Sequence, residues 1–282
     1  MENYRRDDFW DAATWAELDQ AVLDEVRRVR VARQVFPTED LILASGDAPN
    51  WLSTAEVQRD PEAELIIPEE DAPPFINVSV AFQLTLAQVE GRLDVARSIA
   101  RIAAKSLAIA EDNVVFAGGP FRQPGIVATN TARVQGIAPR GVSQQIVGLD
   151  PPFTRAQELL DAVNGGIASL AGNGWPEPYA LILGQDLYEA VFSPLTVNTF
   201  ETPERRITGR VRHLKTTGAL AANQGILVSL AGDPVTIYSA QEASTAYTGE
   251  ILTARGPTYQ FRVTERFQFA IRASSAIRNL AP

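Results

Sequence analysis

Two unusually long segments alternate apolar and polar residues, and this pattern constrains the fold more than any other feature. In the first, every second residue is apolar: Ile76, Val78, Val80, Phe82, Leu84 and Leu86. The second runs from Tyr259 to Ile271, with Glu265 as the one polar residue on its apolar face. Such alternation predicts β-strands with one buried face. Both exceed the usual strand length of about five or six residues, which is typical of strands that reach beyond one domain.

Two amphipathic helices are predicted beside these strands. The first covers residues 14–35, where Thr14 and Glu17 form a capping box and an apolar stripe follows. It either packs on its own domain as a plain surface helix or serves as an N-terminal arm. The second covers residues 94–112; its isoleucines, Ile102 among them, share one side, and its many alanines allow close packing against a sheet.

The stretch between the first helix and the first long strand, residues 37–75, is broken by prolines and rich in acids. A segment of this kind is either disordered or an extended arm. The apolar patches Trp51-Leu52 and Leu65-Ile66-Ile67 favour a β-hairpin arm whose apolar face needs a partner, with a solvated loop as the alternative.

Residues 125–240 alternate helix and strand signals. The pattern predicts a helix over residues 154–172, a short buried strand over 179–183 and a short helix over 186–192. A polar loop follows at 193–208, and residues 226–239 read as a hairpin around Ala231-Gly232-Asp233-Pro234.

Composition argues against an enzyme. Cysteine is absent, and the single histidine, His213, lies in a basic stretch that predicts a surface residue. No nucleophile elbow, zinc-binding helix, phosphate-binding loop or dinucleotide fingerprint occurs. The acids of residues 60–71 lie in an extended segment, so a carboxylate or metal site there would lack preorganisation. We therefore predict no catalytic residues, no metal site and no cofactor, and keep an unrelated soluble enzyme as a remote alternative.

The net charge and the hydropathy of the chain limit which kinds of partner it can bind. The net charge of -9 disfavours general nucleic-acid binding, which needs a basic surface. No apolar run is long enough to span a bilayer, and the polar start does not read as a signal peptide. These features predict a cytoplasmic protein with no membrane partner.

Four stretches, taken together, resemble one known family. They are the helix start Trp15–Asp19, the long-strand start Pro74–Leu84, the helix end Ile109–Gly118 and the final-strand segment Thr264–Phe269. Their order and spacing are similar to those of type 1 encapsulins, the linocin-like shell proteins of the HK97-type capsid superfamily. No single motif is diagnostic; the resemblance rests on their collinearity over nearly the whole chain.

The resemblance implies a mixed α+β subunit with the HK97-type capsid fold. Its parts would be an N-terminal helical arm over residues 1–36, an extended loop over 37–75, a peripheral domain over 76–124 and 241–282 that contains the spine helix, and an axial domain over 125–240.

The function implied is that of a structural subunit. The chain would self-assemble into an icosahedral bacterial nanocompartment in the cytoplasm and enclose a cargo protein through a targeting peptide. The alternative is the major capsid protein of a tailed bacteriophage, which would enclose DNA with the help of a scaffolding protein and reside in the virion.

The resemblance also implies three sets of site residues. A cargo groove would include Arg33, Val35, Glu242, Ala243, Ser244 and Ala246, unless Arg33 and Glu242 simply close a local ion pair. A pore loop over residues 193–202 would present Thr196, Asn198, Thr199 and Glu201. The inter-subunit arm would contact a neighbour through Trp51, Asp60, Glu62, Glu64, Ile66, Glu69 and Glu70.

Overall fold

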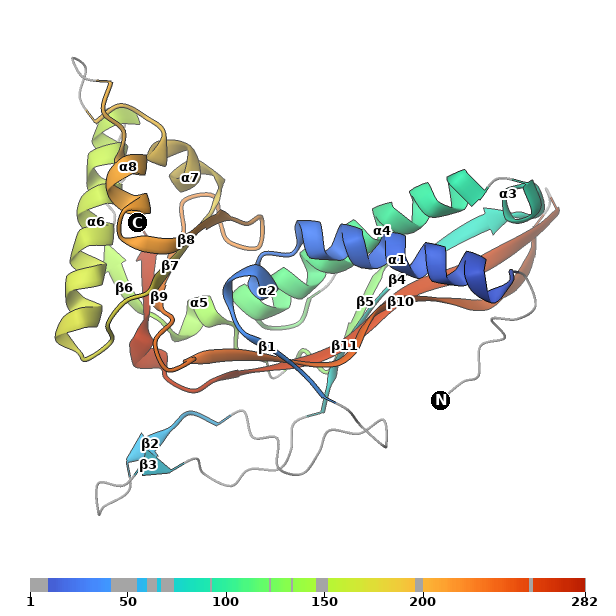
Figure 1. Ribbon diagram of the computed structural model, residues 1–282, viewed down its shortest axis with the longest axis horizontal. Coiled ribbons are helices and arrows are strands. Elements are labelled where there is room, and N and C mark those ends of the chain that lie inside the picture. The colour runs from blue at the N-terminus through green and yellow to red at the C-terminus, as the bar shows by residue number, and fades with distance from the viewer. Residues whose placement is uncertain are drawn as a thin grey trace.

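The computed structural model describes residues 10–41, 55–59, 65–66, 74–91, 93–121, 123–132, 134–145, 152–195, 200–253 and 256–281. These residues form a mixed α+β subunit, as predicted. Their strands make two five-stranded sheets and one two-stranded hairpin. The second sheet lies at one end of an elongated molecule, and the long strands of the first sheet run along the rest of its length (Figure 1).

The first sheet contains both long predicted strands as direct neighbours. Its strands, in spatial order, are β1 (Thr38–Asp40), β10 (Val235–Thr253), β11 (Gly256–Ile271), β4 (Ile76–Thr85) and β5 (Ile126–Thr129). β11 runs antiparallel to β4 and places Phe261 opposite Phe82, with the two rings stacked at 5.4 Å. β10 pairs with β11 along nearly its whole length. The sequence predicted a strand that ends at residue 239, but the strand continues to Thr253.

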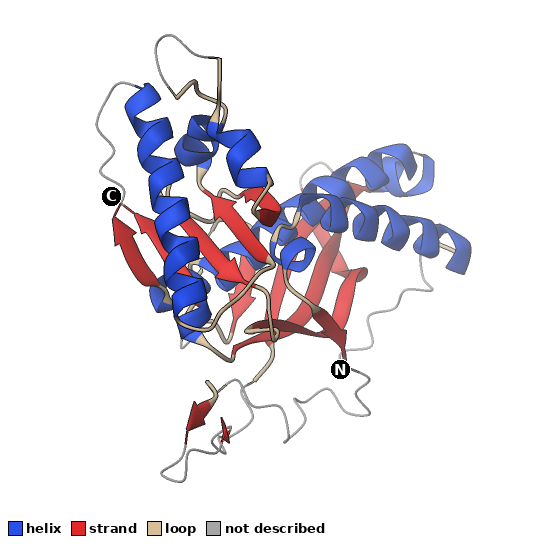
Figure 2. Cartoon of the chain, turned by 60° about the vertical axis from the view of Figure 1, so that its left-hand side comes forward, coloured by secondary structure: helices blue, strands red, loops and turns tan. Residues whose placement is uncertain are grey.

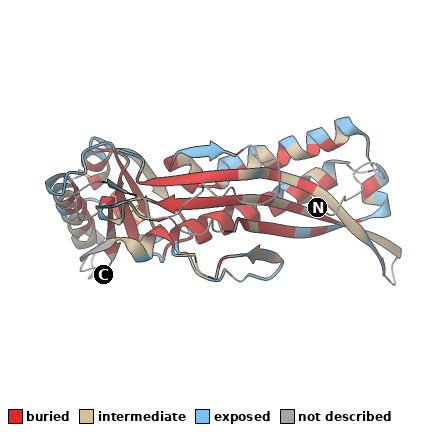
Figure 3. Cartoon of the chain, turned by 90° about the horizontal axis from the view of Figure 1, so that it is seen from below, coloured by how far each residue is buried: buried red, intermediate tan, exposed pale blue. Residues whose placement is uncertain are grey.

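Four helices accompany the first sheet: α1 (Ala12–Val29), α2 (Ala32–Val35), α3 (Leu86–Gly91) and α4 (Leu93–Phe116). α1 and α4 lie side by side on one face of the sheet (Figures 1 and 2). Figure 3, coloured by burial, shows the long strands as the continuous buried middle of the molecule.

The first helix differs from its prediction at both ends. Asp11 is the N-cap: its Oδ1 accepts the Thr14 backbone N–H at 2.8 Å, so Thr14 lies inside the first turn. The helix also ends at Val29 rather than running on to residue 35, because Arg30 has extended backbone angles and α2 starts anew at Ala32.

The inward face of α4 consists mainly of alanines, such as Ala100 and Ala104. Of the isoleucines that the sequence placed together on one side, Ile102 is 64% exposed, whereas Ile99 is half-buried against the core. Small residues allow the helix to lie close to the sheet and to α1, and that packing outweighs the greater hydrophobicity of isoleucine.

The second sheet has shorter strands. They are, in spatial order, β6 (Val142–Gln145), β12 (Ile277–Ala281), β9 (Gly225–Ser229), β7 (Tyr179–Leu183) and β8 (Val211–Thr216). With it come α5 (Ile137–Arg140), α6 (Pro152–Gly172), α7 (Gln185–Val191), α8 (Pro203–Thr208) and the short 3₁₀ turn at Ser274–Ala276. α8 lies within residues 193–208, which the sequence predicted to be a loop.

The predicted hairpin over residues 226–239 is wrong. The turn exists, with positive φ at Gly232 and Asp233, but β9 belongs to the second sheet and β10 to the first. This turn therefore carries the chain from one sheet to the other. Two strands also lie in a different sheet from most of their predicted domain. β5 falls in the predicted axial domain but lies in the first sheet, and β12 falls in the predicted peripheral domain but lies in the second.

The arm is described only in part. β2 (Gln58–Arg59) and β3 (Leu65–Ile66) pair antiparallel, which agrees with the predicted hairpin. The hairpin lies on the side of the first sheet opposite to α1 and α4 (Figure 1). Leu65 is 67% exposed, so this part of the arm contributes apolar surface to the outside of the subunit.

Candidate functional site

The predicted cargo-groove residues come together where α2 meets β10. The Arg33 Nη1 atom lies 3.0 Å from Glu242 Oε1, which is the ion pair that the alternative interpretation foresaw. Val35 and Ala243 are buried in the core. Ser244 and Ala246 are half-buried, so these two, with Glu242, form the accessible part of the set.

This ion pair belongs to a larger charge cluster of six residues: Arg30, Arg33, Glu111, Asp112, Glu242 and Glu265. Four elements supply them: the arginines lie just before and within α2, Glu111 and Asp112 lie in the last two turns of α4, Glu242 lies on β10 and Glu265 on β11. The cluster therefore fastens the N-terminal helices to α4 and to the first sheet.

Both guanidinium groups are buried and reach the same three glutamates. Arg30 and Arg33 side chains are 5% and 4% exposed. Arg30 lies 3.4 Å from Glu111 and 3.3 Å from Glu242, and Arg33 contacts the same two carboxylates. Arg33 also donates to the Ser239 hydroxyl at 3.2 Å.

Glu265 is held differently. It is fully buried, and its nearest arginine atoms lie 3.7 Å away, too far for a hydrogen bond. Neither carboxyl oxygen has a hydrogen-bond partner among the described residues. Burial raises the pKa of Glu265 well above its ordinary value, and the Glu111 carboxylate raises it further, against the opposing effect of Arg33 and Arg30.

Asp112 explains the break between α1 and α2. Its carboxyl accepts the backbone N–H of Val31 at 2.9 Å and that of Ala32 at 2.9 Å, so it caps α2 from another helix. Burial raises the pKa of Asp112 to about 7, although these two backbone donors act to lower it.

Glu242, the partly exposed acid of the cluster, behaves in the opposite way. Burial acts to raise its pKa, but Arg30 and Arg33 outweigh burial and leave the pKa below its ordinary value. A second contact fixes α1 beside this strand: the Thr245 backbone N–H donates to Asp19 Oδ1 at 2.8 Å.

Four members of the cluster were not predicted as site residues: Arg30, Glu111, Asp112 and Glu265. Two signals were visible. Glu265 interrupts an otherwise apolar strand face, and Glu111-Asp112 follows an alanine-rich helical stretch. Arginines three residues apart, Arg30 and Arg33, are the bases that such buried acids need.

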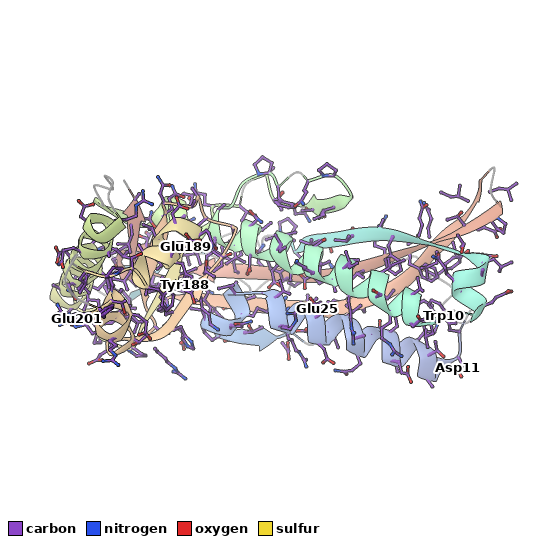
Figure 4. All side chains as sticks on the ribbon, turned by 90° about the horizontal axis from the view of Figure 1, so that it is seen from above. Trp10, Asp11, Glu25, Tyr188, Glu189 and Glu201 are labelled. Atoms are coloured by element: carbon purple, nitrogen blue, oxygen red, sulfur yellow. The ribbon has the colours of Figure 1, made fainter. Side chains whose placement is uncertain are left out.

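The described ends of the predicted pore loop, residues 193–195 and 200–202, follow α7 and precede α8. Thr196, Asn198 and Thr199 fall outside the described residues. Glu201 is exposed and lies 2.9 Å from Arg206, and its backbone carbonyl accepts the Leu195 N–H at 2.8 Å. In Figure 4, Glu201 lies near Tyr188 and Glu189 at the end of the molecule far from Trp10.

Most of the predicted arm residues, namely Trp51, Asp60, Glu62, Glu64, Glu69 and Glu70, also fall outside the described residues, and Ile66 is in β3. The base of the arm is fixed to the subunit. The Val57 N–H donates to the Arg272 carbonyl at 2.8 Å, and Glu56 Oε1 accepts from both the backbone N–H and the hydroxyl of Ser274 at 2.6 Å.

Elsewhere, the described part of the chain holds no group of three or more histidine, cysteine or acidic residues placed to bind a metal ion. His213 is half-buried on β8, and burial together with Arg212 and Lys215 lowers its pKa. None of the described helices is long and apolar enough to cross a membrane.

Comparison with known proteins gives one family and several relatives. Residues 1–268 match the family Linocin_M18, described as "Encapsulating protein for peroxidase". The chain is 25% identical over 276 residues to a type 1 encapsulin shell protein of Rhodococcus erythropolis, covering 96% of each chain.

Solved structures share the fold. The virus-like particle from Pyrococcus furiosus aligns with a TM-score of 0.67 at 15% identity, over 94% of this chain and 98% of that one. The holo-SrpI encapsulin complex from Synechococcus elongatus aligns with a TM-score of 0.55 at 11% identity, over 90% and 88%. Phage capsids occur among the similar structures as well, so the fold alone does not separate compartment from capsid.

Proposed function

The chain belongs to the Linocin_M18 family of encapsulating proteins, and from that premise we propose how its subunits close a compartment around a cargo protein. It is a structural shell subunit with the HK97-type fold, not an enzyme. The observation that carries the proposal is the family match over residues 1–268, which spans the N-terminal helices, the arm and all strands except β12 and the end of β11.

We propose that the cargo contacts the subunit along the seam between α1 and β10. Glu242, Ser244 and Ala246 offer a partly exposed strip there, while Arg33, Val35 and Ala243 lie beneath it as support. A shallow strip with small side chains and one carboxylate suits a short extended peptide that carries apolar anchors and a basic residue.

Two further surfaces would serve assembly. The arm, with Leu65 exposed, would lie on a neighbouring subunit, because apolar surface of this kind needs cover. The loop over residues 193–202 would line an opening at a symmetry axis, with Glu201 near its rim. Glu201 already faces Arg206, so its charge at the rim would be partly neutralised.

We propose a bacterial cytoplasmic location for the compartment. The competing assignment is a phage major capsid protein in a virion, whose partners would be DNA and a scaffolding protein. The compartment is favoured because the matched family and the Rhodococcus relative are encapsulating shell proteins.

Assembly is tested by purifying the chain alone. We expect hollow, roughly spherical particles by size-exclusion chromatography and electron microscopy, with no added partner. A protein that stays monomeric at all concentrations would overturn the proposal.

Cargo binding is tested by co-expressing the shell with the enzyme encoded beside it and measuring the enzyme that co-purifies. A change of Ala246→Arg should abolish co-purification and leave the particles intact. The matched control is Ala171→Arg, at an exposed position on α6; particles of this variant should retain the cargo. Val35→Asp is unsuitable here, since Val35 is buried and the change would disturb folding. Particles that hold DNA and no protein would assign the chain to a phage.

A further inference from the structure

The charge cluster contains more acids than bases. Two guanidinium groups, Arg30 and Arg33, face four carboxyl groups from three other elements. Nearby bases lie toward its edges: Arg27 acts on Glu242 from the last turn of α1, and Lys215 of β8 donates to Gln34 at 2.8 Å. With every acid ionised, the buried part of the cluster would carry excess negative charge.

Buried excess charge is strongly unfavourable unless it is paired or protonated. Glu111 is paired with both arginines, and Glu242 is paired with both and also reaches water. Glu265 is the least well compensated, since it is fully buried, its two arginine neighbours lie 3.7 Å away, and neither of its oxygens has a hydrogen-bond partner in the described chain. Asp112 accepts only from backbone N–H groups and contacts no arginine within ion-pair distance among the described residues.

We propose that the charge cluster is a proton-dependent latch. Protons on Glu265 and Asp112 leave two positive and two negative charges in balance and keep α1 and α2 seated on α4 and the first sheet. Loss of these protons leaves an excess of buried negative charge and loosens the N-terminal helices. The latch rests on the fold of the subunit and not on cargo binding.

The direction of the pH response follows from the pKa changes. For Asp112 the pKa rises from 3.8 to about 7 on folding, so its stabilising effect is complete below about pH 4 and is lost as the pH rises to about 7. The raised pKa of Glu265 acts in the same direction and extends the loss to higher pH. Glu242, with its lowered pKa, weakens the cluster only in acid. The latch is therefore tightest in mildly acidic solution.

Hydrogen exchange of empty particles, corrected for the intrinsic pH dependence of amide exchange, measures the latch. One proton released on opening changes the opening equilibrium about tenfold per pH unit, so peptides covering residues 12–35 should open at least about tenfold more often at about pH 7.5 than at about pH 5. Peptides from α6, which lies away from the cluster, should show no such change.

Variants identify the groups responsible. Glu265→Gln combined with Asp112→Asn keeps the shapes of the two side chains and removes both titratable carboxyl groups. The protection of residues 12–35 from hydrogen exchange should then become independent of pH. Glu250→Gln, at an exposed position on β10, should leave the wild-type response intact. Wild-type protection of residues 12–35 that does not change with pH would overturn the latch, whether or not the double variant folds. An unchanged pH response in a folded double variant would overturn it as well.

Discussion

The two sheets of this subunit bury their central strands in different ways. In the second sheet, β7 and β9 are short and every residue is buried, with an apolar core on both sides. In the first sheet, β4 and β11 are long and bury alternate residues over part of their length, and the helix-covered side contains a charge cluster as well as apolar side chains.

The difference follows from the length of the strands and from the helices that cover them. A short strand is enclosed by the helices beside it, so apolar volume alone can stabilise it. The long strands of the first sheet receive α1 and α2 from the far N-terminal end of the chain, and paired charges specify where these helices must lie. Stability in the second sheet should therefore depend on packing, and stability in the first on charge pairing as well as on packing.

The largest loss of stability is expected when the cluster loses its central carboxylate. Glu111→Ala takes from two buried guanidinium groups the fully buried carboxylate that hydrogen-bonds to both, which should lower the free energy of unfolding by about 3–5 kcal/mol. Thermal unfolding of empty particles measures the loss. Glu242→Ala is the matched control: it contacts the same arginines but is 34% exposed, so water can replace it and the loss should be much smaller. Equal losses for both variants would show that burial does not set the contribution of each acid.

A packing defect in the second sheet should cost somewhat less and should not depend on pH. Leu181→Ala on fully buried β7 removes apolar volume from the core beside the second sheet, which should lower the free energy of unfolding by about 3 kcal/mol. The same unfolding measurement, repeated at mildly acidic and at neutral pH, should give the same difference from wild type. Leu252→Ala, at an exposed position on β10, should have almost no effect. A pH-dependent loss for Leu181→Ala would remove the distinction between the sheets.

The same contrast explains which features could be predicted from the sequence. Strands β4, β7 and β11 and helices α6 and α7 were recognisable because their apolar pattern is local and strong. The break between α1 and α2 at Arg30 was not recognisable, because α2 is capped by Asp112, which lies 80 residues after Ala32 in the sequence. Likewise, the turn at Gly232-Asp233 was visible, but local turn residues do not tell whether the flanking strands pair with each other or join different sheets.

Of the candidate site, the pairing of Arg33 with Glu242 was foreseen only as an alternative, and the sequence could not place Glu111 and Glu265 beside it. The alanines of α4 were expected to allow close packing against a sheet, and they form most of its inward face. Hydrophobicity ranks Ile102 above Ala103, yet close approach to the sheet and to α1 selects the smaller residue.

The smallest effect on the subunit itself, with the greatest effect on assembly, is expected from the arm. Deleting residues 58–70 removes the hairpin and keeps the contacts of Glu56 and Val57 that fix its base. Because the described hairpin residues pair with one another, the unfolding free energy of the subunit should change by less than about 0.5 kcal/mol. Shell closure should nevertheless fail, since the arm is the part that we expect to lie on a neighbour, and weak contacts that symmetry repeats add up across a shell.

Circular dichroism would establish that the subunit is folded, and electron microscopy would count closed particles. Leu65→Ser, which keeps the arm and removes one exposed apolar side chain, should reduce closure less than the deletion does. Intact shells from the deletion would show that the two sheets, and not the arm, carry the contacts between subunits.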